Sequence, residues 1–270
     1  MITLTDEEFE LFRGFIKKRF GINLSKEKKS LVYSRLRATV EQKKLSSFKD
    51  YYEILISDKD TEITKEFVDR ITTNHTFFMR EKEHFTFLRE KVFPDIEQRH
   101  NASKDIRLWC AACSSGEEAY TLQMLIQDYF GTKQGWNCEI LATDISNTVL
   151  SKAYRGVYSK DSIAELPADW QRKYFVEYDE NHMIAHDILK KNITFTRFNF
   201  IEDSFNFKKM FQVIFCRNAM IYFDGSTRTT LVNKFYAATE PGGFLFIGQS
   251  ESLGHSDTKY KYAMPAVYKK

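Results

Sequence analysis

The 270-residue sequence lacks long apolar runs, because no stretch reaches the length of about eighteen apolar residues that spans a membrane. Its first segment, MITLTDEEFELF, is acidic and does not contain the apolar stretch of a signal peptide. Internal repeats and low-complexity tracts are also absent. We therefore expect a soluble, cytoplasmic protein that does not insert directly into a membrane.

Cysteine is scarce, with four in the chain. Cys110 and Cys113 form a C-x-x-C pair, which in other contexts binds zinc or performs redox chemistry. No second C-x-x-C follows, and no two histidines stand at the spacing of metal ligands. The pattern favours small buried thiols and predicts a protein without a bound metal.

The glycine fingerprint of dinucleotide-binding proteins, G-x-G-x-x-G, is also missing. In its place stands IRLWCAACSSGEEAYTL, residues Ile106–Leu122, which predicts a buried strand, a loop of small residues and a helix. This order is typical of the opening unit of a nucleotide-type site in an open α/β sheet. An ordinary strand-to-helix turn packed with small side chains is the alternative.

Strand and helix patterns alternate from Ile106 onward, which predicts an α/β fold with a doubly wound, mainly parallel sheet. We expect strands at 106–110, 139–144, 193–200, 211–218 and 242–250, and a final edge strand at 263–268. Residues from about 159 to 192 interrupt the alternation. They predict a small antiparallel β insertion, in which 173–178 pairs with 182–186.

The first 72 residues show helical spacing and no strand pattern. We predict an all-α N-terminal domain (1–72) ahead of the sheet domain (73–270). Thr5 and Glu8 form a capping box before the first helix, Gly21 ends that helix, and Thr61 opens a later one.

Positive charge is concentrated in this N-terminal part. Residues 13–44 hold eleven basic and two acidic residues, a net +9 in a chain of net charge +3, so the remainder carries −6. A helix predicted from Ser25 to about Lys44 places Lys26, Arg37 and Lys44 on one face. That face suits an acidic partner, although a solvated surface has the same pattern.

Polar residues stand at the carboxyl ends of the predicted strands, where ligands bind in such sheets: Glu117, Asp144, Asn199 and Asn218. Each one alone could be a helix cap or a turn residue. Glu117 and Glu118 at the helix start would repel a pyrophosphate, whereas they suit a ligand with an amino group and a ribose. S-adenosylmethionine is such a ligand.

Four motifs, TNHTFFMR, WCAACSSGEEAY, CRNAMIYFD and GGFLFIGQSES, resemble those of the CheR family of chemotaxis receptor methyltransferases, in the family's order. The resemblance implies a class I S-adenosylmethionine-dependent methyltransferase fold. It also implies a protein-glutamate O-methyltransferase that esterifies glutamates on the cytoplasmic helices of chemoreceptors and releases S-adenosylhomocysteine. We expect it to act as a monomer.

The resemblance also assigns site residues position by position. The expected cofactor-binding residues are Asn74, Thr76, Arg80, Glu117, Asp144, Asn199, Phe200, Asn218 and Ala219. Arg80 would orient carboxylates and Tyr222 would line the transfer site, so these two are the expected catalytic residues. Ala119, Ala219 and Gln249 depart from the family's usual proline, valine and histidine, and Gln249 puts any role of that histidine in doubt.

The resemblance suggests receptor helices as the partner of the basic helix, docked through Lys26, Arg37 and Lys44. In the family, a glycine-bearing loop of the β insertion can bind a C-terminal receptor peptide. The corresponding loop here, 177–182, contains no glycine, so we expect no pentapeptide tether. The alternatives are a methyltransferase of the same fold that acts on another acidic protein or on nucleic acid. No nucleic-acid partner is expected, because the sequence has no NPPY-like tetrapeptide.

Overall fold

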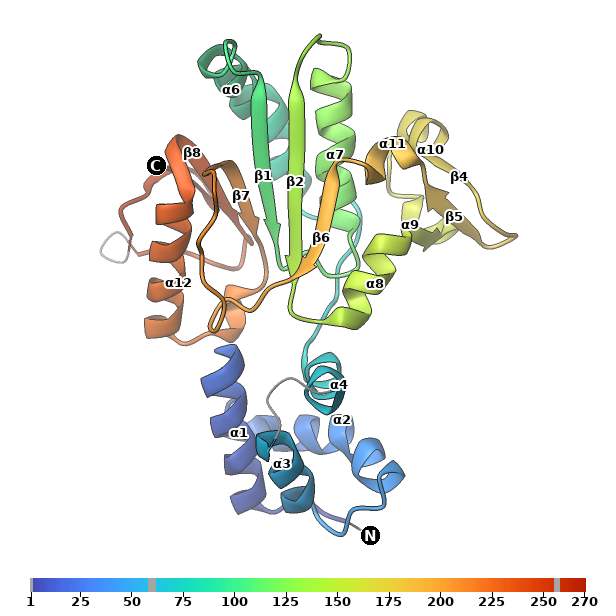
Figure 1. Cartoon of the computed structure of the whole chain (residues 1–270), viewed down its shortest axis with the longest axis vertical. Coiled ribbons are helices and arrows are strands. Elements are labelled where there is room, and N and C mark those ends of the chain that lie inside the picture. The colour runs from blue at the N-terminus through green and yellow to red at the C-terminus, as the bar shows by residue number, and fades with distance from the viewer. Residues whose placement is uncertain (1, 58–61, 255–257) are drawn as a thin grey trace.

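The structure is a computed structural model that describes residues 2–57, 62–254 and 258–270. Within these ranges it contains a helical N-terminal part, a seven-stranded sheet and a three-stranded sheet (Figure 1). No helix in the described ranges is long and apolar enough to cross a membrane.

The N-terminal part is helical, as predicted. Its elements are α1 (Asp6–Phe20), η1 (Lys26–Lys28), α2 (Lys29–Gln42), α3 (Phe48–Ser57) and α4 (Glu62–Ile71). The predicted capping box starts α1, since the Thr5 hydroxyl accepts the Glu8 N–H and the Glu8 carboxylate accepts the Thr5 N–H. Gly21, with φ 74°, ends α1 in a left-handed conformation. Phe12, Phe48 and Phe67 belong to a core separate from that of the sheet.

The basic helix is shorter than predicted. Lys26 lies in the 3-10 turn η1 ahead of α2, and Lys44 lies beyond the end of α2. The helix stops because Lys44 takes a left-handed φ of 54° and the Leu45 N–H donates to the Val40 carbonyl, as in a Schellman motif. The prediction of one continuous helical face that carries Lys26, Arg37 and Lys44 is therefore wrong. The predicted helix start at Thr61 lies outside the described residues.

The large sheet has the predicted doubly wound, mainly parallel form. Its strands are β1 (Asp105–Ala111), β2 (Asn137–Asp144), β6 (Ile193–Arg197), β7 (Phe211–Cys216), β8 (Thr239–Ile247), β9 (Lys261–Met264) and β10 (Val267–Lys269). The order is β6-β2-β1-β7-β8-β10-β9, and the first five of these are parallel. The predicted single edge strand at 263–268 is wrong, because Ala266 takes a left-handed φ of 61° and turns the chain between β9 and β10.

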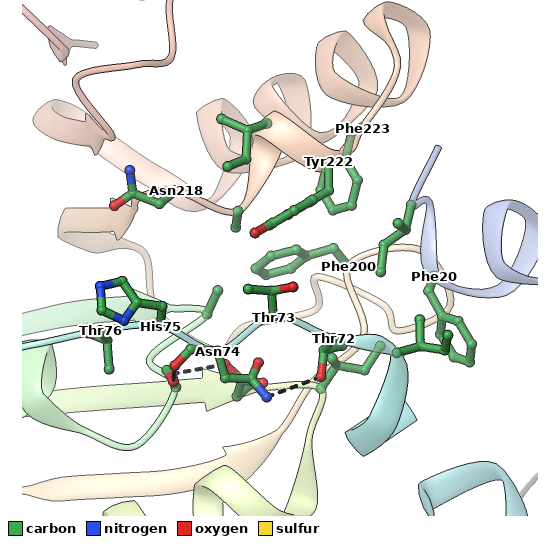
Figure 2. Close-up of a pocket in the computed structure, with 18 of the residues that line it drawn as sticks. Phe20, Thr72, Thr73, Asn74, His75, Thr76, Phe200, Asn218, Tyr222 and Phe223 are labelled. Carbon is green, nitrogen blue, oxygen red and sulfur yellow. Dashed lines mark hydrogen bonds between the residues drawn. The ribbon is translucent and has the colours of Figure 1, made fainter. Parts of the chain in front are cut away.

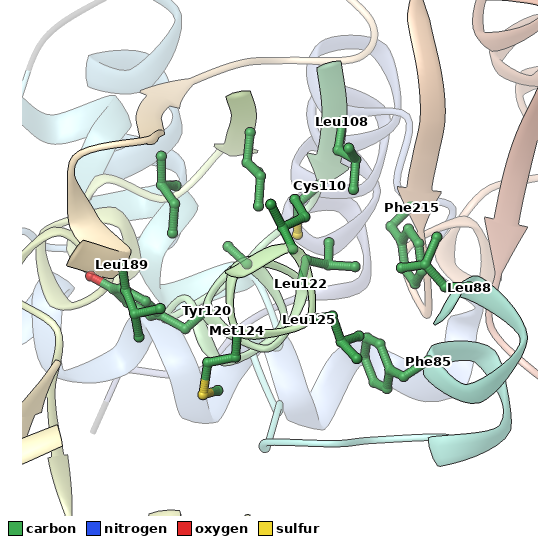
Figure 3. Close-up of a cluster of buried hydrophobic side chains, with 14 of the residues drawn as sticks. Phe85, Leu88, Leu108, Cys110, Tyr120, Leu122, Met124, Leu125, Leu189 and Phe215 are labelled. Atoms are coloured by element: carbon green, nitrogen blue, oxygen red, sulfur yellow. The ribbon is translucent and has the colours of Figure 1, made fainter. Parts of the chain in front are cut away.

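Helices cover both faces of this sheet. They are α5 (Lys82–Phe87), η2 (Leu88–Val92), α6 (Phe93–Arg99), α7 (Glu117–Phe130), α8 (Asn147–Arg155), η3 (Met220–Tyr222) and α12 (Gly225–Ala238). Successive side chains of β1 point to opposite faces of the sheet. Leu108 and Cys110 pack towards α7, and Trp109 packs towards α12. Figure 3 shows the first of these cores, where side chains of α7 meet Leu108 and Phe215 from the strands.

The small sheet confirms the predicted hairpin. Strand β4 (Phe175–Glu177) pairs antiparallel with β5 (His182–Ala185), and a third strand that was not predicted, β3 (Val157–Ser159), pairs with β5. The short helices α9 (Lys160–Ile163), α10 (Ala168–Tyr174) and α11 (Asp187–Lys190) complete the insertion. Asp128 of α7 anchors it by accepting hydrogen bonds from Trp170 (2.6 Å) and Tyr174 (2.6 Å).

Candidate functional site

A cavity of about 620 Å³ lies where strands β1, β2 and β7 end, beside the N-terminal part. Its walls come from six segments of the chain: 20–35, 71–80, 112–118, 144–145, 198–200 and 217–223. In Figure 2 the Tyr222 and Phe200 side chains project into this space, and the 72–76 segment borders it. The parallel strands thus bring distant segments to one site, as ligand sites in open α/β sheets require.

The loop after β1 is closely packed. Gly116 has φ 98°, and a Cβ atom there would come within 2.9 Å of the Tyr158 hydroxyl. The Ser114 backbone N–H donates to Asp144, and the Ser114 hydroxyl donates to the Asn74 carbonyl at 2.8 Å. These bonds fix the loop against both β2 and the 72–76 segment, so small residues are needed there for close packing.

Asp144 ends β2 inside the cavity wall and is buried. Its carboxylate accepts the backbone N–H groups of Ser114 at 2.9 Å and of Ser146 at 3.0 Å. Burial raises the pKa of Asp144, and the two N–H bonds oppose that rise. An acceptor-only carboxylate with spare lone pairs at this position can receive hydroxyl groups of a ligand.

The two glutamates at the start of α7 differ in position. The Glu117 carboxylate accepts the Ser115 hydroxyl at 2.8 Å, and Glu117 is not among the cavity-lining residues. Glu118 does line the cavity, so the geometry favours Glu118, while cofactor binding by Glu117 stays a prediction. Burial raises the pKa of Glu118, and the neighbouring Arg217 opposes this.

Arg217, which the sequence analysis missed, holds Glu118 in place. The guanidinium is buried and bonds Glu118 at 2.8 Å and Glu81 at 3.0 Å. It also lies over the Phe85 ring, at 5.4 Å from the centroid. The sequence contains a signal for this role, because Arg217 directly follows the apolar end of β7. A charged side chain at such a buried position needs a partner of opposite charge.

The 72–80 segment contributes three predicted residues to the cavity, Asn74, Thr76 and Arg80. Arg80 donates one hydrogen bond to the His75 carbonyl at 3.0 Å and lies over the Phe77 ring. Within the described residues it forms no ion pair with a carboxylate. Its remaining N–H donors can therefore bind an acidic group.

The loops after β6 and β7 supply the rest of the predicted site. Phe200, Asn218, Ala219 and Tyr222 all line the cavity. Asn218 lies beyond the end of β7 with a left-handed φ of 57°, rather than inside a strand as predicted.

Asn199 also lies in a loop, because β6 ends at Arg197. Its amide donates to the Arg19 carbonyl at 2.9 Å. The side chain of Asn199 therefore joins its loop to the N-terminal helix α1, although the residue borders the cavity.

The predicted docking residues lie outside the cavity lining. Arg37 pairs with Glu41 at 2.7 Å, whereas Lys26 and Lys44 are exposed. Lys28 and Arg35 line the cavity instead. Arg35 donates to the Thr73 hydroxyl at 2.8 Å, so it holds the segment that connects the two parts of the chain.

All four cysteines are free and buried, and the Cys110 thiol donates to Glu118 at 3.2 Å. Burial raises the pKa of both Cys110 and Cys113. In the part of the chain that the structure describes, no group of three or more His, Cys, Asp or Glu side chains could hold a metal ion.

Comparison with known families matches both parts of this architecture. Residues 7–72 match the all-alpha domain of CheR methyltransferase, and residues 74–268 match the SAM binding domain of CheR methyltransferase. The chain belongs to the CheR methyltransferase family. It is therefore an S-adenosylmethionine-dependent methyltransferase, and its cofactor is S-adenosylmethionine.

Relatives from several bacteria are similar along the whole CheR chain. The chemotaxis protein methyltransferase of Borreliella burgdorferi is 39% identical over 100% of this chain and 96% of its own length. Chemotaxis protein methyltransferase 2 of Vibrio cholerae is 34% identical over 93% and 88%, and the Escherichia coli chemotaxis protein methyltransferase is 31% identical over 99% and 92%. Both domains are thus shared with these proteins.

The cavity residues of this CheR chain fit S-adenosylmethionine chemically. Asp144 offers carboxylate lone pairs for ribose hydroxyls, and Glu118 offers negative charge for the amino group and the sulfonium. Phe200 provides an aromatic face for a flat purine. The predicted cofactor-binding and catalytic residues therefore lie around one cavity, apart from Glu117.

Proposed function

We propose that the chain methylates glutamate side chains on the cytoplasmic helices of chemoreceptors, and that it works in the cytoplasm. The relatives named as chemotaxis protein methyltransferases support this proposal. The observation that carries it is the convergence of Arg80, Asp144 and Tyr222 on one cavity. An arginine with free donors beside a cofactor site suits a carboxylate as the methyl acceptor.

S-adenosylmethionine, when bound, supplies an electrophilic methyl group. A glutamate carboxylate is ionised at neutral pH, so the chain needs no general base to activate it. Arg80 orients the carboxylate through its planar N–H donors. Tyr222 lines the transfer site and donates its hydroxyl to an acceptor oxygen. The apolar rings of Phe198 and Phe200 also line this cavity. Positioning of the carboxylate against the methyl group then provides most of the rate enhancement.

We further propose that the positive N-terminal surface steers the acidic receptor bundle to the cavity. Lys26 and Lys44 are exposed, and within the described residues neither forms an ion pair, so both remain available to a partner. Arg37 is partly neutralised by Glu41 and contributes less. Such contacts raise the association rate and weaken with salt.

The β insertion supports the view that no receptor-tail peptide is required. Its connecting turn is short and closed, since the Tyr178 N–H donates to the His182 carbonyl at 3.0 Å. Asp179 accepts the Asn181 and His182 N–H groups, and no glycine opens the turn. Calorimetric titration with receptor C-terminal peptides tests this, and low-micromolar binding would contradict it.

The experiment that tests the proposed function uses radiolabelled S-adenosylmethionine and a receptor cytoplasmic fragment. We expect label in the fragment that mild base releases, because carboxyl methyl esters hydrolyse in base and methylated amines do not. An acidic protein of unrelated fold and a duplex DNA serve as alternative acceptors. Transfer to either of these at the rate seen with the receptor would overturn the proposal.

A further inference from the structure

Glu251 is a buried carboxylate that no part of the proposed reaction uses. It lies four residues beyond the end of β8 and is 7% exposed. Its own N–H donates to the Gly248 carbonyl at 2.8 Å, so residues 248–251 form a tight turn. This turn directs the Glu251 side chain back towards the loop that follows β7.

Three backbone N–H groups converge on the Glu251 carboxylate. One oxygen accepts from Gly248 at 2.6 Å and from Asn218 at 3.0 Å, and the other accepts from Ile221 at 3.0 Å. Burial raises the pKa of Glu251, and these bonds oppose the rise. Residues 218–221 belong to a loop and a short 3-10 turn, so an external acceptor must satisfy their N–H groups.

The loop that Glu251 contacts contains a left-handed residue. Asn218 has a φ of 57°, a conformation that asparagine adopts more readily than other non-glycine residues, and its N–H donates to the Glu251 carboxylate. Gly248 packs against the same residue, since a Cβ at Gly248 would come within 2.9 Å of the Asn218 backbone nitrogen. The strand end and the loop are therefore in direct contact.

The loop held in this way carries the cavity residues Asn218, Ala219, Ile221 and Tyr222. We propose that Glu251 is a positioning residue, whose carboxylate fixes the backbone of 218–221 and so places Asn218 and Tyr222 in the cavity. This inference rests on the proposed function in one respect, since one of its tests measures methyl transfer to the receptor. A carboxylate is suited to the task, because it only accepts, with two oxygens, and it faces three donors.

Two substitutions perturb the contact from opposite sides. Glu251→Gln keeps the shape of the side chain but replaces one accepting oxygen with an amide NH₂ group. Two donors then face each other where a hydrogen bond was present. Gly248→Ala pushes on the Asn218 backbone and leaves Glu251 intact. The control is Glu240→Gln on the same strand β8, at its other end, where the carboxylate accepts from Arg99 at 2.8 Å and from Gln212 at 2.8 Å.

Amide hydrogen exchange of residues 217–224 without cofactor gives the first test. Glu251→Gln and Gly248→Ala should each accelerate exchange there about tenfold or more, because charge-assisted bonds to the N–H groups are lost. Both should weaken S-adenosylmethionine binding by a similar factor in calorimetry, while Glu240→Gln leaves both quantities unchanged. Wild-type exchange and affinity in a folded Glu251→Gln variant would overturn the proposal, as would equal losses in Glu240→Gln.

A double-mutant cycle with Tyr222→Phe separates positioning from general stabilisation. At saturating S-adenosylmethionine, Glu251→Gln should slow methyl transfer by about 10-fold to 100-fold in the wild-type background, and by less than about threefold when Tyr222→Phe is present. Additive losses would refute action through Tyr222. If Glu251→Gln fails to fold, Gly248→Ala decides alone, and wild-type behaviour of that variant refutes the proposal. A wild-type chain that binds cofactor but ignores receptors would overturn the proposed function, while the exchange and affinity measurements would still decide the role of Glu251.

Discussion

Removing the buried arginine, Arg217→Met, tests how the cavity wall is held together. The substitution keeps an apolar stem against Phe85 but removes the charge that pairs with Glu118 and Glu81. Glu118 then stays buried without a counter-charge. Breaking a buried pair on one side costs about 3–5 kcal/mol of the free energy of unfolding.

The loss should depend on pH with a definite sign. Burial raises the pKa of Glu118 in the folded chain, and Arg217 makes the largest contribution that opposes this rise, so its removal raises the pKa further. A carboxyl whose folded pKa exceeds its unfolded value takes up a proton on folding, so the variant regains stability as the pH falls through the folded pKa. The difference from wild type should therefore be smaller at about pH 5.5 than at about pH 8.

Urea unfolding followed by circular dichroism at both pH values measures this difference. Arg217→Met combined with Glu118→Gln should recover part of the loss, because the unpaired charge of Glu118 is then removed while Glu81 still lacks its partner. Arg172→Met breaks an exposed pair with Asp169 and should cost less than about 1 kcal/mol. A cost below about 1 kcal/mol for Arg217→Met, or an equal cost at both pH values, would refute the reasoning.

Three further outcomes are expected. Asp144→Asn should weaken S-adenosylmethionine binding about 100-fold in calorimetry, because a charged acceptor is lost from the cavity, and an unchanged affinity would contradict this. Arg80→Ala and Tyr222→Phe should each lower the methyl-transfer rate at least about tenfold, with little change in the thermal midpoint, whereas wild-type turnover would remove their assigned roles. Reversing the charges of the docking residues Lys26, Arg37 and Lys44 should raise the KM for the receptor at low salt. This increase should disappear as the salt concentration rises.

Much of the site could be predicted because it depends on strand ends. Asp144 ends β2 and Asn218 follows β7, so the parallel arrangement alone brings them to one edge of the sheet. In the short 72–80 segment, the residue type of Arg80 suggests binding of carboxylates, but its assignment to the cofactor site came from the family resemblance. Composition and spacing do not distinguish that segment from an ordinary linker.

The choice between Glu117 and Glu118 could not be made from the sequence. It depends on how the loop after β1 turns, and that loop contains left-handed backbone at Ala112 and Ser114 in addition to Gly116. These conformations are set by bonds to Asp144 and Asn74, which lie 30 and 40 residues away. Local pattern therefore identifies the loop but does not show which carboxylate faces the cavity.

Arg217 and Glu251 were missed for a related reason. Arg217 binds a glutamate 99 residues away, and Glu251 binds backbone groups 30 and 33 residues away. Neither interaction has a periodic signature, because each joins segments that are far apart in the sequence. The predicted end of the basic helix was wrong because of one residue. Lys44 takes a left-handed conformation and ends the helix without the usual glycine.

Peptide mass spectrometry of a receptor cytoplasmic fragment is the most direct test of methyl transfer to glutamate. The fragment is incubated with the wild-type chain and S-adenosylmethionine, with the Asp144→Asn variant as the matched control. We expect methyl groups on glutamate side chains of the fragment, which are lost after treatment with base and are much reduced with the variant. Methylation confined to lysine, arginine or other side chains, or equal methylation by the variant, would contradict it.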